Sequence, residues 1–135
     1  VIQSLDSVPL AEEIERQAAL RGIRKRVLIE VNAAGEATKS GVAPEEAEPF
    51  LNRIRGMDHL IPCGLMAIPP KRENPEENCE LFRKIYGLFL DIGKKNADNE
   101  EWRVLSLGMS GDYLPAVRNG SSLVRIGSGI FGPRS

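Results

Sequence analysis

Short apolar runs alternate with amphipathic stretches from one end of the chain to the other. The apolar runs suit buried strands, and the stretches between them repeat apolar residues every three or four positions, as helices do. Repeated β-α units around a parallel sheet produce this alternation. The strands that we expect are Val1–Leu5, Arg26–Asn32, Ile61–Ile68, Trp102–Leu107 and Leu123–Ile126.

Each amphipathic stretch carries one apolar stripe, which predicts a helix packed on the sheet. Pro49 falls inside the second stretch, and because an interior proline usually kinks or interrupts a helix, this stretch could form one helix or two pieces. A short helix is expected over Asp112–Asn119. The stripes of the three longer helices are Leu10, Ile14 and Ala18, then Ala47, Phe50, Leu51 and Ile54, then Cys79, Phe82, Tyr86, Phe89 and Gly93.

Two parallel architectures fit this order of elements, a flavodoxin-like open sheet and a (β/α)8 barrel. The last third of the chain favours the barrel, because Leu107–Asp112 and Ile126–Gly129 are glycine-serine loops after consecutive strands. In phosphate-binding barrels the anion lies between the loops after strands 7 and 8. We therefore expect residues 1–135 to be the C-terminal part of one barrel domain. They would supply its last five strands, and the first three would lie outside this chain.

The composition narrows the partner classes. Apolar residues make up 41% and charged residues 27% of the chain, as in ordinary folded proteins, and no apolar segment is long enough to cross a membrane. The net charge of -1 argues against a nucleic-acid partner.

Cys63 and Cys79 are expected to be buried, reduced thiols of a cytoplasmic protein. The single histidine, His59, precludes a histidine-based metal site and is expected to be a solvated surface residue.

The candidate chemistry lies in the last two loops. Ser110 follows a strand and could donate to a phosphate oxygen, although a plain helix N-cap explains it equally well. Gly127 and Ser128 offer unobstructed amides beside it. Arg125 alternates onto the interior side of its strand, where an unpaired guanidinium is costly, so it requires a ligand or an interior carboxylate. We expect Ile130–Gly132 to be packed.

Two other segments are weaker candidates. Asn32 ends a strand and could face a ligand, but a loop-capping role explains it better. Gly35–Gly41 contains a glycine, a lysine and a serine, yet it lacks the spacing of a nucleotide-binding phosphate loop. No nucleophile arrangement can be built around one misplaced histidine, so we expect no catalytic residues and no metal site.

Six motifs occur in the order seen in the pyridoxal phosphate homeostasis protein family, which the chain resembles over essentially its whole length. The resemblance implies a (β/α)8 barrel like that of alanine racemase, with pyridoxal 5'-phosphate (PLP) as cofactor. It implies that Ser110 and the amides of Gly127 and Ser128 hold the phosphate, that Arg125 faces the pyridine nitrogen, and that Met66 and Asn32 also belong to the cofactor-binding set. The motifs are Ile2–Ser7, Val31–Asn32, Glu36–Gly41, Gly64–Ile68, Leu107–Asp112 and Val124–Gly132.

The chain departs from the family in one respect. The family's Schiff-base lysine ends the first barrel strand, and none of the six lysines present matches its motif, so we expect that lysine outside this chain. Three further β-α units amount to about 100 residues. We expect the remaining N-terminal part of the same protein to supply them. The lysines present are Lys25, Lys39, Lys71, Lys84, Lys94 and Lys95.

The resemblance implies a non-catalytic protein that carries and buffers PLP in vitamin B6 homeostasis, with PLP-dependent apoenzymes as candidate partners. A protonated arginine beside the pyridine nitrogen agrees with this, because it disfavours protonation of the ring. The alternative is a PLP-dependent racemase or another phosphate-binding barrel enzyme. A racemase needs a catalytic tyrosine, and only Tyr113 is placed to reach the site, since Tyr86 belongs to a helix stripe. A mere interaction module explains neither the paired loops nor Arg125.

Overall fold

A computed structural model describes all 135 residues and contains one sheet of five parallel strands. The predicted parallel arrangement is confirmed. The strands lie side by side in chain order, so the strand reversal that defines a flavodoxin-like open sheet is absent. This succession is that of a partial (β/α) barrel. The strands are β1 (Ile2–Leu5), β2 (Lys25–Val31), β3 (Leu60–Ala67), β4 (Val104–Met109) and β5 (Leu123–Arg125).

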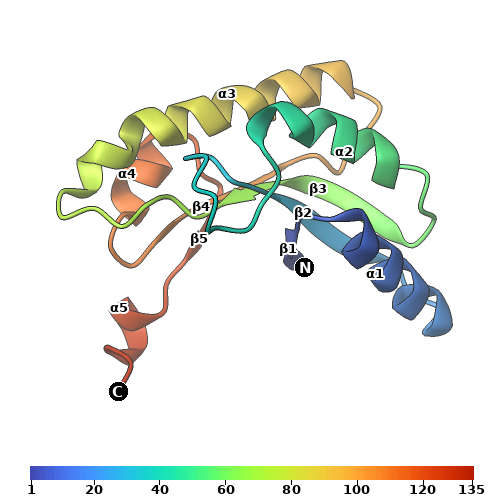
Figure 1. Cartoon of the computed structure of the whole chain (residues 1–135), viewed down its shortest axis with the longest axis horizontal. Coiled ribbons are helices and arrows are strands. Elements are labelled where there is room, and N and C mark those ends of the chain that lie inside the picture. Colours follow the sequence, from blue (N-terminus) through green and yellow to red (C-terminus); the bar gives the residue numbers. More distant parts are fainter.

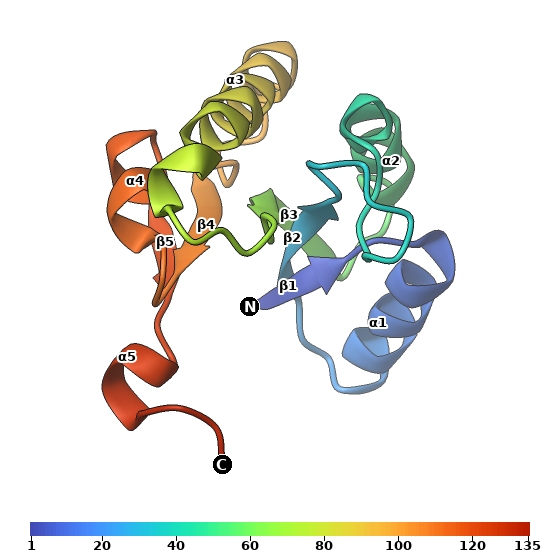
Figure 2. The ribbon, with the colours of Figure 1, turned by 60° about the vertical axis from the view of Figure 1, so that its left-hand side comes forward.

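Helices cover one face of this sheet (Figure 1). In Figure 2, α1 to α4 form an arc on one side of the strands, whereas the N-terminus and α5 lie on the open side. The second predicted helix does form two pieces, because a 3₁₀ turn at Pro44–Glu46 precedes α2, which begins at Ala47. Pro49 does not interrupt α2. It lies in the first turn, where a missing N–H needs no partner. The helices are α1 (Val8–Leu20), α2 (Ala47–Ile54), α3 (Cys79–Lys95), α4 (Tyr113–Arg118) and α5 (Ser128–Phe131).

The main core lies between the helices and the face of the sheet that they cover, which we call the outer face. Twenty buried residues form one apolar cluster there. Two predicted stripes are displaced from the observed ones. Leu10 is exposed in α1, which buries Ala11 and Ala18, and Tyr86 is exposed in α3, which buries Phe82, Ile85 and Ile92. Tyr86 instead lies over Gly120, where an added Cβ would come within 2.4 Å of its ring.

The sheet is strongly curved. The Ser106 hydroxyl on β4 donates to Gln3 Oε1 on β1 over 2.7 Å, although β2 and β3 separate the two strands. Three strand spacings amount to about 14 Å along a flat sheet, farther than these two side chains reach. The side opposite the helices is therefore concave, and we call it the inner face. Leu28, Cys63 and Met66 form a small buried apolar cluster there.

Gly64 shows why β3 and β4 approach so closely. Its φ is +151°, and a Cβ at this position would lie 1.7 Å from the Val104 carbonyl oxygen. The pairing of β2 with β3 shifts register between Val27 and Leu28, next to this glycine. A glycine inside a strand is typical of such a close backbone approach, and the structure shows one at Gly64.

The cysteines and the histidine differ in part from expectation. Cys63 is buried on β3, and burial raises the pKa of its thiol, whereas Cys79 at the start of α3 is only half-buried. Both thiols are free. His59 is not simply solvated, because its Nδ1 lies 2.8 Å from Glu15 Oε1.

No group of three or more histidine, cysteine or acidic side chains is arranged to hold a metal. None of the helices combines the length and apolar character needed to cross a membrane.

Candidate functional site

The loops that follow β4 and β5 meet at the carboxyl ends of these strands. Ser110 Oγ accepts a hydrogen bond from the Gly129 amide at 2.9 Å and one from the Gly127 amide at 3.3 Å. Because the oxygen accepts both bonds, the hydroxyl proton of Ser110 remains available to a further acceptor. The N-cap alternative is wrong, since α4 begins at Tyr113 and Asp112 occupies its N-cap position.

The β4 loop has a defined shape because both of its ends are held. Gly108 has a φ of +96°, and a Cβ there would lie 2.7 Å from the Ala116 side chain. The Met109 backbone amide donates to Asp112 Oδ1 at 2.8 Å, and the side-chain amide of the buried Asn78 donates to Asp112 Oδ2 at 3.3 Å. These contacts fix Ser110 relative to the start of α4 and to the segment before α3.

Two serines that the sequence analysis did not single out align β5 with β4. Ser122 Oγ accepts a bond from the Leu105 amide at 2.9 Å, and Ser121 Oγ donates to the Leu107 carbonyl at 2.7 Å. Their hydroxyls thus bond to β4 backbone groups just before β5 begins. The signal that could have revealed them is a pair of small hydroxyl residues directly before a short strand. They set the register that brings Arg125 to the inner face.

Arg125 lies at the end of β5 and is half-buried. Its guanidinium donates to the Ser106 hydroxyl, to the Ser106 carbonyl at 3.1 Å and to the Ala67 carbonyl at 3.0 Å. No carboxylate forms an ion pair with it, so the interior salt bridge considered above is absent. Of its five N–H groups, three are used and two remain for a ligand.

The charge of Arg125 is compensated only from a distance. Burial lowers the pKa of its guanidinium, and the carboxylates of Asp112 and Glu30 oppose that effect. An arginine stays protonated in proteins even so. The inner face therefore presents a positive charge with open donors, next to a serine hydroxyl held by backbone amides. This combination suits a ligand that carries an anionic group and a neutral hydrogen-bond acceptor.

The remaining predicted residues border this region on β2 and β3. Met66 is buried on the inner face and lies opposite Glu30 in register. Glu30 is also buried and accepts a bond from the Ser40 hydroxyl at 2.9 Å. Asn32 donates to the Glu36 carbonyl at 2.7 Å, so it caps its own loop. Contact of Asn32 with a ligand, the weaker of its two predicted roles, stays a prediction.

One expectation about the C-terminal segment is wrong for this chain taken alone. Ile130 and Phe131 were expected to be packed, but they are 69% and 85% exposed. They belong to α5, which extends away from the sheet on its open side (Figure 1). Within this chain nothing covers them, although the same segment supplies the Gly127 and Gly129 amides that bond to Ser110.

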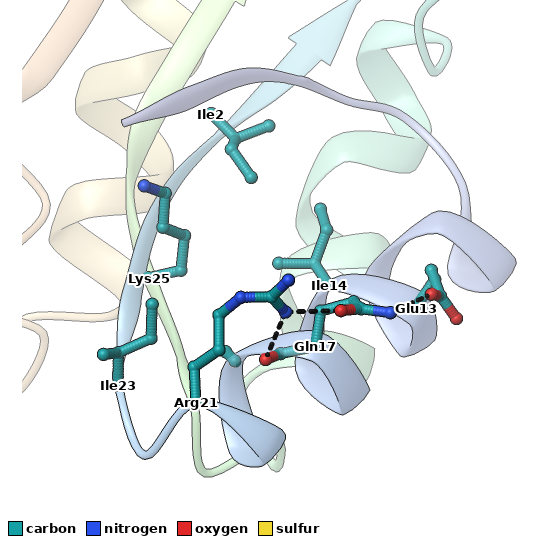
Figure 3. A pocket seen from close by; sticks show the side chains of 8 residues that line it. Ile2, Glu13, Ile14, Gln17, Arg21, Ile23 and Lys25 are labelled. Atoms are coloured by element: carbon teal, nitrogen blue, oxygen red, sulfur yellow. Dashed lines mark hydrogen bonds between the residues drawn. The ribbon is translucent and has the colours of Figure 1, made fainter.

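An apolar hollow lies at the opposite end of the strands. Figure 3 shows it between the last turns of α1 and the first residues of β1 and β2, where Ile2, Ile14 and Lys25 line it. Its polar side chains bond to one another, for example Gln17 Nε2 to Glu13 Oε1 at 2.9 Å. No set of free polar groups converges there, so we place the candidate site on the inner face.

Comparison with known proteins gives a consistent result. The family model described as "Alanine racemase, N-terminal domain" matches residues 1–135. The chain is 40% identical over 134 residues to the pyridoxal phosphate homeostasis protein of Aquifex aeolicus (strain VF5), covering 99% of this chain and 58% of that protein. The chain thus spans little more than half the length of this relative.

Two solved structures have the same arrangement of elements. One is an unknown protein from Bifidobacterium adolescentis, with a TM-score of 0.88, 37% identity and coverage of 96% of this chain and 52% of that one. The other is PipY of Synechococcus elongatus PCC7942 with PLP bound, with a TM-score of 0.83, 27% identity and coverage of 97% and 60%.

Proposed function

The chain belongs to the alanine racemase N-terminal domain family, and from this premise we propose that it provides the phosphate and ring-nitrogen contacts of a PLP-binding protein. In this proposal the complete protein carries and buffers PLP in vitamin B6 homeostasis and performs no turnover of its own. The homeostasis-protein name of the Aquifex relative and the PLP bound to PipY support it. The single observation that carries it is the contact of the two loops through Ser110, beside Arg125.

The phosphate contacts follow from the donors at the loops. Ser110 has a free hydroxyl proton. Ser128 is the first residue of α5, so no carbonyl within the helix can accept a hydrogen bond from its amide. The Gly127 and Gly129 amides point at Ser110 Oγ and would share their hydrogen bonds with an anion placed beside it. Hydrogen bonds of this kind to a charged group are roughly twice as strong as neutral ones.

Arg125 would hold the ring nitrogen with one of its two unused N–H groups. PLP supplies, when bound, an electron-withdrawing ring that stabilises carbanions. A guanidinium keeps its proton, so in this position it donates to the nitrogen and disfavours protonation of the ring. The chain would then retain the cofactor without activating it strongly, which suits a carrier better than a racemase.

The curvature of the sheet supports a closed (β/α)8 barrel in the complete protein. Strands β1 and β5 each pair with only one neighbour, and an unpaired strand edge is an unfavourable place to end a sheet. We propose that this chain supplies the last five strands and that the remaining part of the same protein supplies the first three. Ile130 and Phe131 on the open side would be covered by that part.

Titration of the complete protein with PLP tests the phosphate contacts. Replacing Ser110 with Ala removes the hydroxyl and the anchor of both amides, so PLP binding should weaken by about 1–3 kcal/mol. The exposed Ser135 provides a matched control, because Ser135→Ala should leave binding unchanged. Equal affinities for wild type and Ser110→Ala would exclude this loop from the site.

The same protein tests the position of the lysine that holds PLP covalently. The six lysines of this chain lie on α3, at the amino end of β2 and in the loops after β2 and β3, and none lies within a strand on the inner face. Borohydride reduction of the PLP-loaded protein, followed by peptide mapping, should find the pyridoxyl group on a lysine outside this chain. Labelling of any of the six would refute this part of the proposal.

A further inference from the structure

A partly buried chain of hydrogen bonds leads from β1 to the guanidinium of Arg125. Ser106 is fully buried, donates to Gln3 Oε1 at 2.7 Å and accepts a bond from Arg125. An arginine offers donors only, so the Ser106 proton cannot be directed toward it. The proton must therefore lie toward Gln3, and the chain of bonds has a single direction: Arg125 to Ser106 to Gln3.

The chain of bonds limits how the guanidinium can turn. One terminal nitrogen of Arg125 donates to both oxygens of Ser106 on β4, and the other donates to the Ala67 carbonyl on β3. Contacts to two different strands fix the plane of the guanidinium, because its N–H groups form a rigid fork. The directions of the two unused N–H groups are fixed with it.

The polarity of Ser106 is not explained by packing. Its neighbours along β4, Leu105 and Leu107, are buried and apolar on the outer face, and the nearby inner-face residues Leu28 and Met66 are apolar as well. Burying a hydroxyl is unfavourable unless its hydrogen bonds are satisfied. The Ser106 hydroxyl forms its hydrogen bonds only with Gln3 and Arg125, so its role is to hold the guanidinium of Arg125.

We propose that Ser106, oriented by Gln3, is a positioning residue that aims the unused N–H groups of Arg125 at the bound ligand. The inference rests on the proposed function, because it concerns the orientation of Arg125 toward the PLP ring. Ser106 itself would not touch the cofactor. Its effect on the cofactor would pass through Arg125 alone.

The test uses the complete protein loaded with PLP and compares absorption spectra and dissociation constants. Ser106→Ala should shift the absorption band of bound PLP in the same direction as Arg125→Leu does and raise the dissociation constant roughly two- to tenfold. Ser106→Thr keeps the hydroxyl and should restore the wild-type spectrum. Gln3→Met should give a smaller shift in the same direction. Because Gln3 is only half-buried, this variant tests the inference if Ser106→Ala does not fold.

The double variant separates positioning from direct contact. If Ser106 acts through Arg125, then adding Ser106→Ala to Arg125→Leu should change neither the spectrum nor the affinity further. Additive effects, or a Ser106→Ala spectrum that superimposes on the wild type while Arg125→Leu shifts it, would overturn the inference. Failure of the wild-type protein to bind PLP would instead overturn the proposed function, so the two failures are distinguishable.

Discussion

The outer and inner faces of the sheet are built from alternating residues of the same strands, yet they differ sharply in chemistry. On β4, Leu105 and Leu107 enter the twenty-residue apolar core beneath the helices, whereas Ser106 between them turns to the inner face and bonds to Arg125. The inner face holds only three buried apolar residues and also carries Gln3, Glu30, Ser106 and Arg125. The outer face thus accounts for folding, and the inner face retains polar groups whose burial only a ligand or a network explains.

The strongest test of this division is a cavity in the outer core. Phe82 is fully buried beneath α3, so Phe82→Ala should lower the free energy of unfolding of the complete protein by about 3–5 kcal/mol. Urea unfolding measures the loss, and Leu90→Ala on the exposed side of the same helix should cost much less. PLP affinity of the molecules that remain folded should not change. A large loss of affinity in that fraction would mean that the two faces are not separable.

The complementary change lies on the inner face. Arg125→Leu should shift the absorption band of bound PLP while lowering the free energy of unfolding much less than Phe82→Ala does, because removing a partly desolvated charge offsets the loss of its hydrogen bonds. The affinity for PLP should fall less than it does in Ser110→Ala, because Arg125 would contact the ring and not the phosphate. Arg26→Leu is the matched control, since Arg26 lies at the amino end of β2 and pairs only with Glu101. If both variants shift the spectrum alike, Arg125 has no special role.

Much of this division could be predicted from the sequence, and the missing parts have a common cause. The five strands, the tight approach at Gly64 and the pairing of the last two loops follow from local patterns. The bond between Gln3 and Ser106 does not, because it depends on the curvature of the whole sheet and joins residues 103 positions apart. Periodicity reports which residues are apolar but not which distant strand faces them.

The helix faces show the same limit. The stripe that includes Tyr86 has helical spacing, but the outer face of the sheet meets α3 along Phe82, Ile85 and Ile92. Trp102 was expected to begin β4, yet it precedes the strand, stacks on Phe89 with ring centroids 5.7 Å apart and donates to the Phe89 carbonyl. Each deviation is a tertiary contact whose partner lies in another element.

The smallest expected effect concerns the contact between Glu15 and His59, at the amino end of the strands and far from the inner-face site. Burial raises the pKa of Glu15, but hydrogen bonds from the His59 ring and amide outweigh it, so the pKa is lowered in the folded protein. A carboxylate with a lowered folded pKa stabilises the fold above its unfolded pKa of about 4.3, and the contribution is lost as the pH falls further.

Glu15→Gln should therefore lower the free energy of unfolding by no more than about 1 kcal/mol at pH 7, and the difference from wild type should shrink as the pH falls toward 3. Urea unfolding at the two pH values measures it, with the exposed Glu12→Gln as control. PLP binding should be unaffected. A difference that stays constant with pH would show that the charge of Glu15 is not what stabilises this end of the sheet.

The most direct test of the central claim, that the inner face holds the cofactor, is a crystal structure of the complete protein grown with PLP. The phosphate should lie within hydrogen-bond distance of Ser110 Oγ and of the amides between Gly127 and Gly129, with an unused N–H of Arg125 donating to the ring nitrogen. PLP bound elsewhere, for instance in the hollow beside α1 that Ile2 and Ile14 line, with the loops of Ser110 and Gly127 empty, would contradict the account.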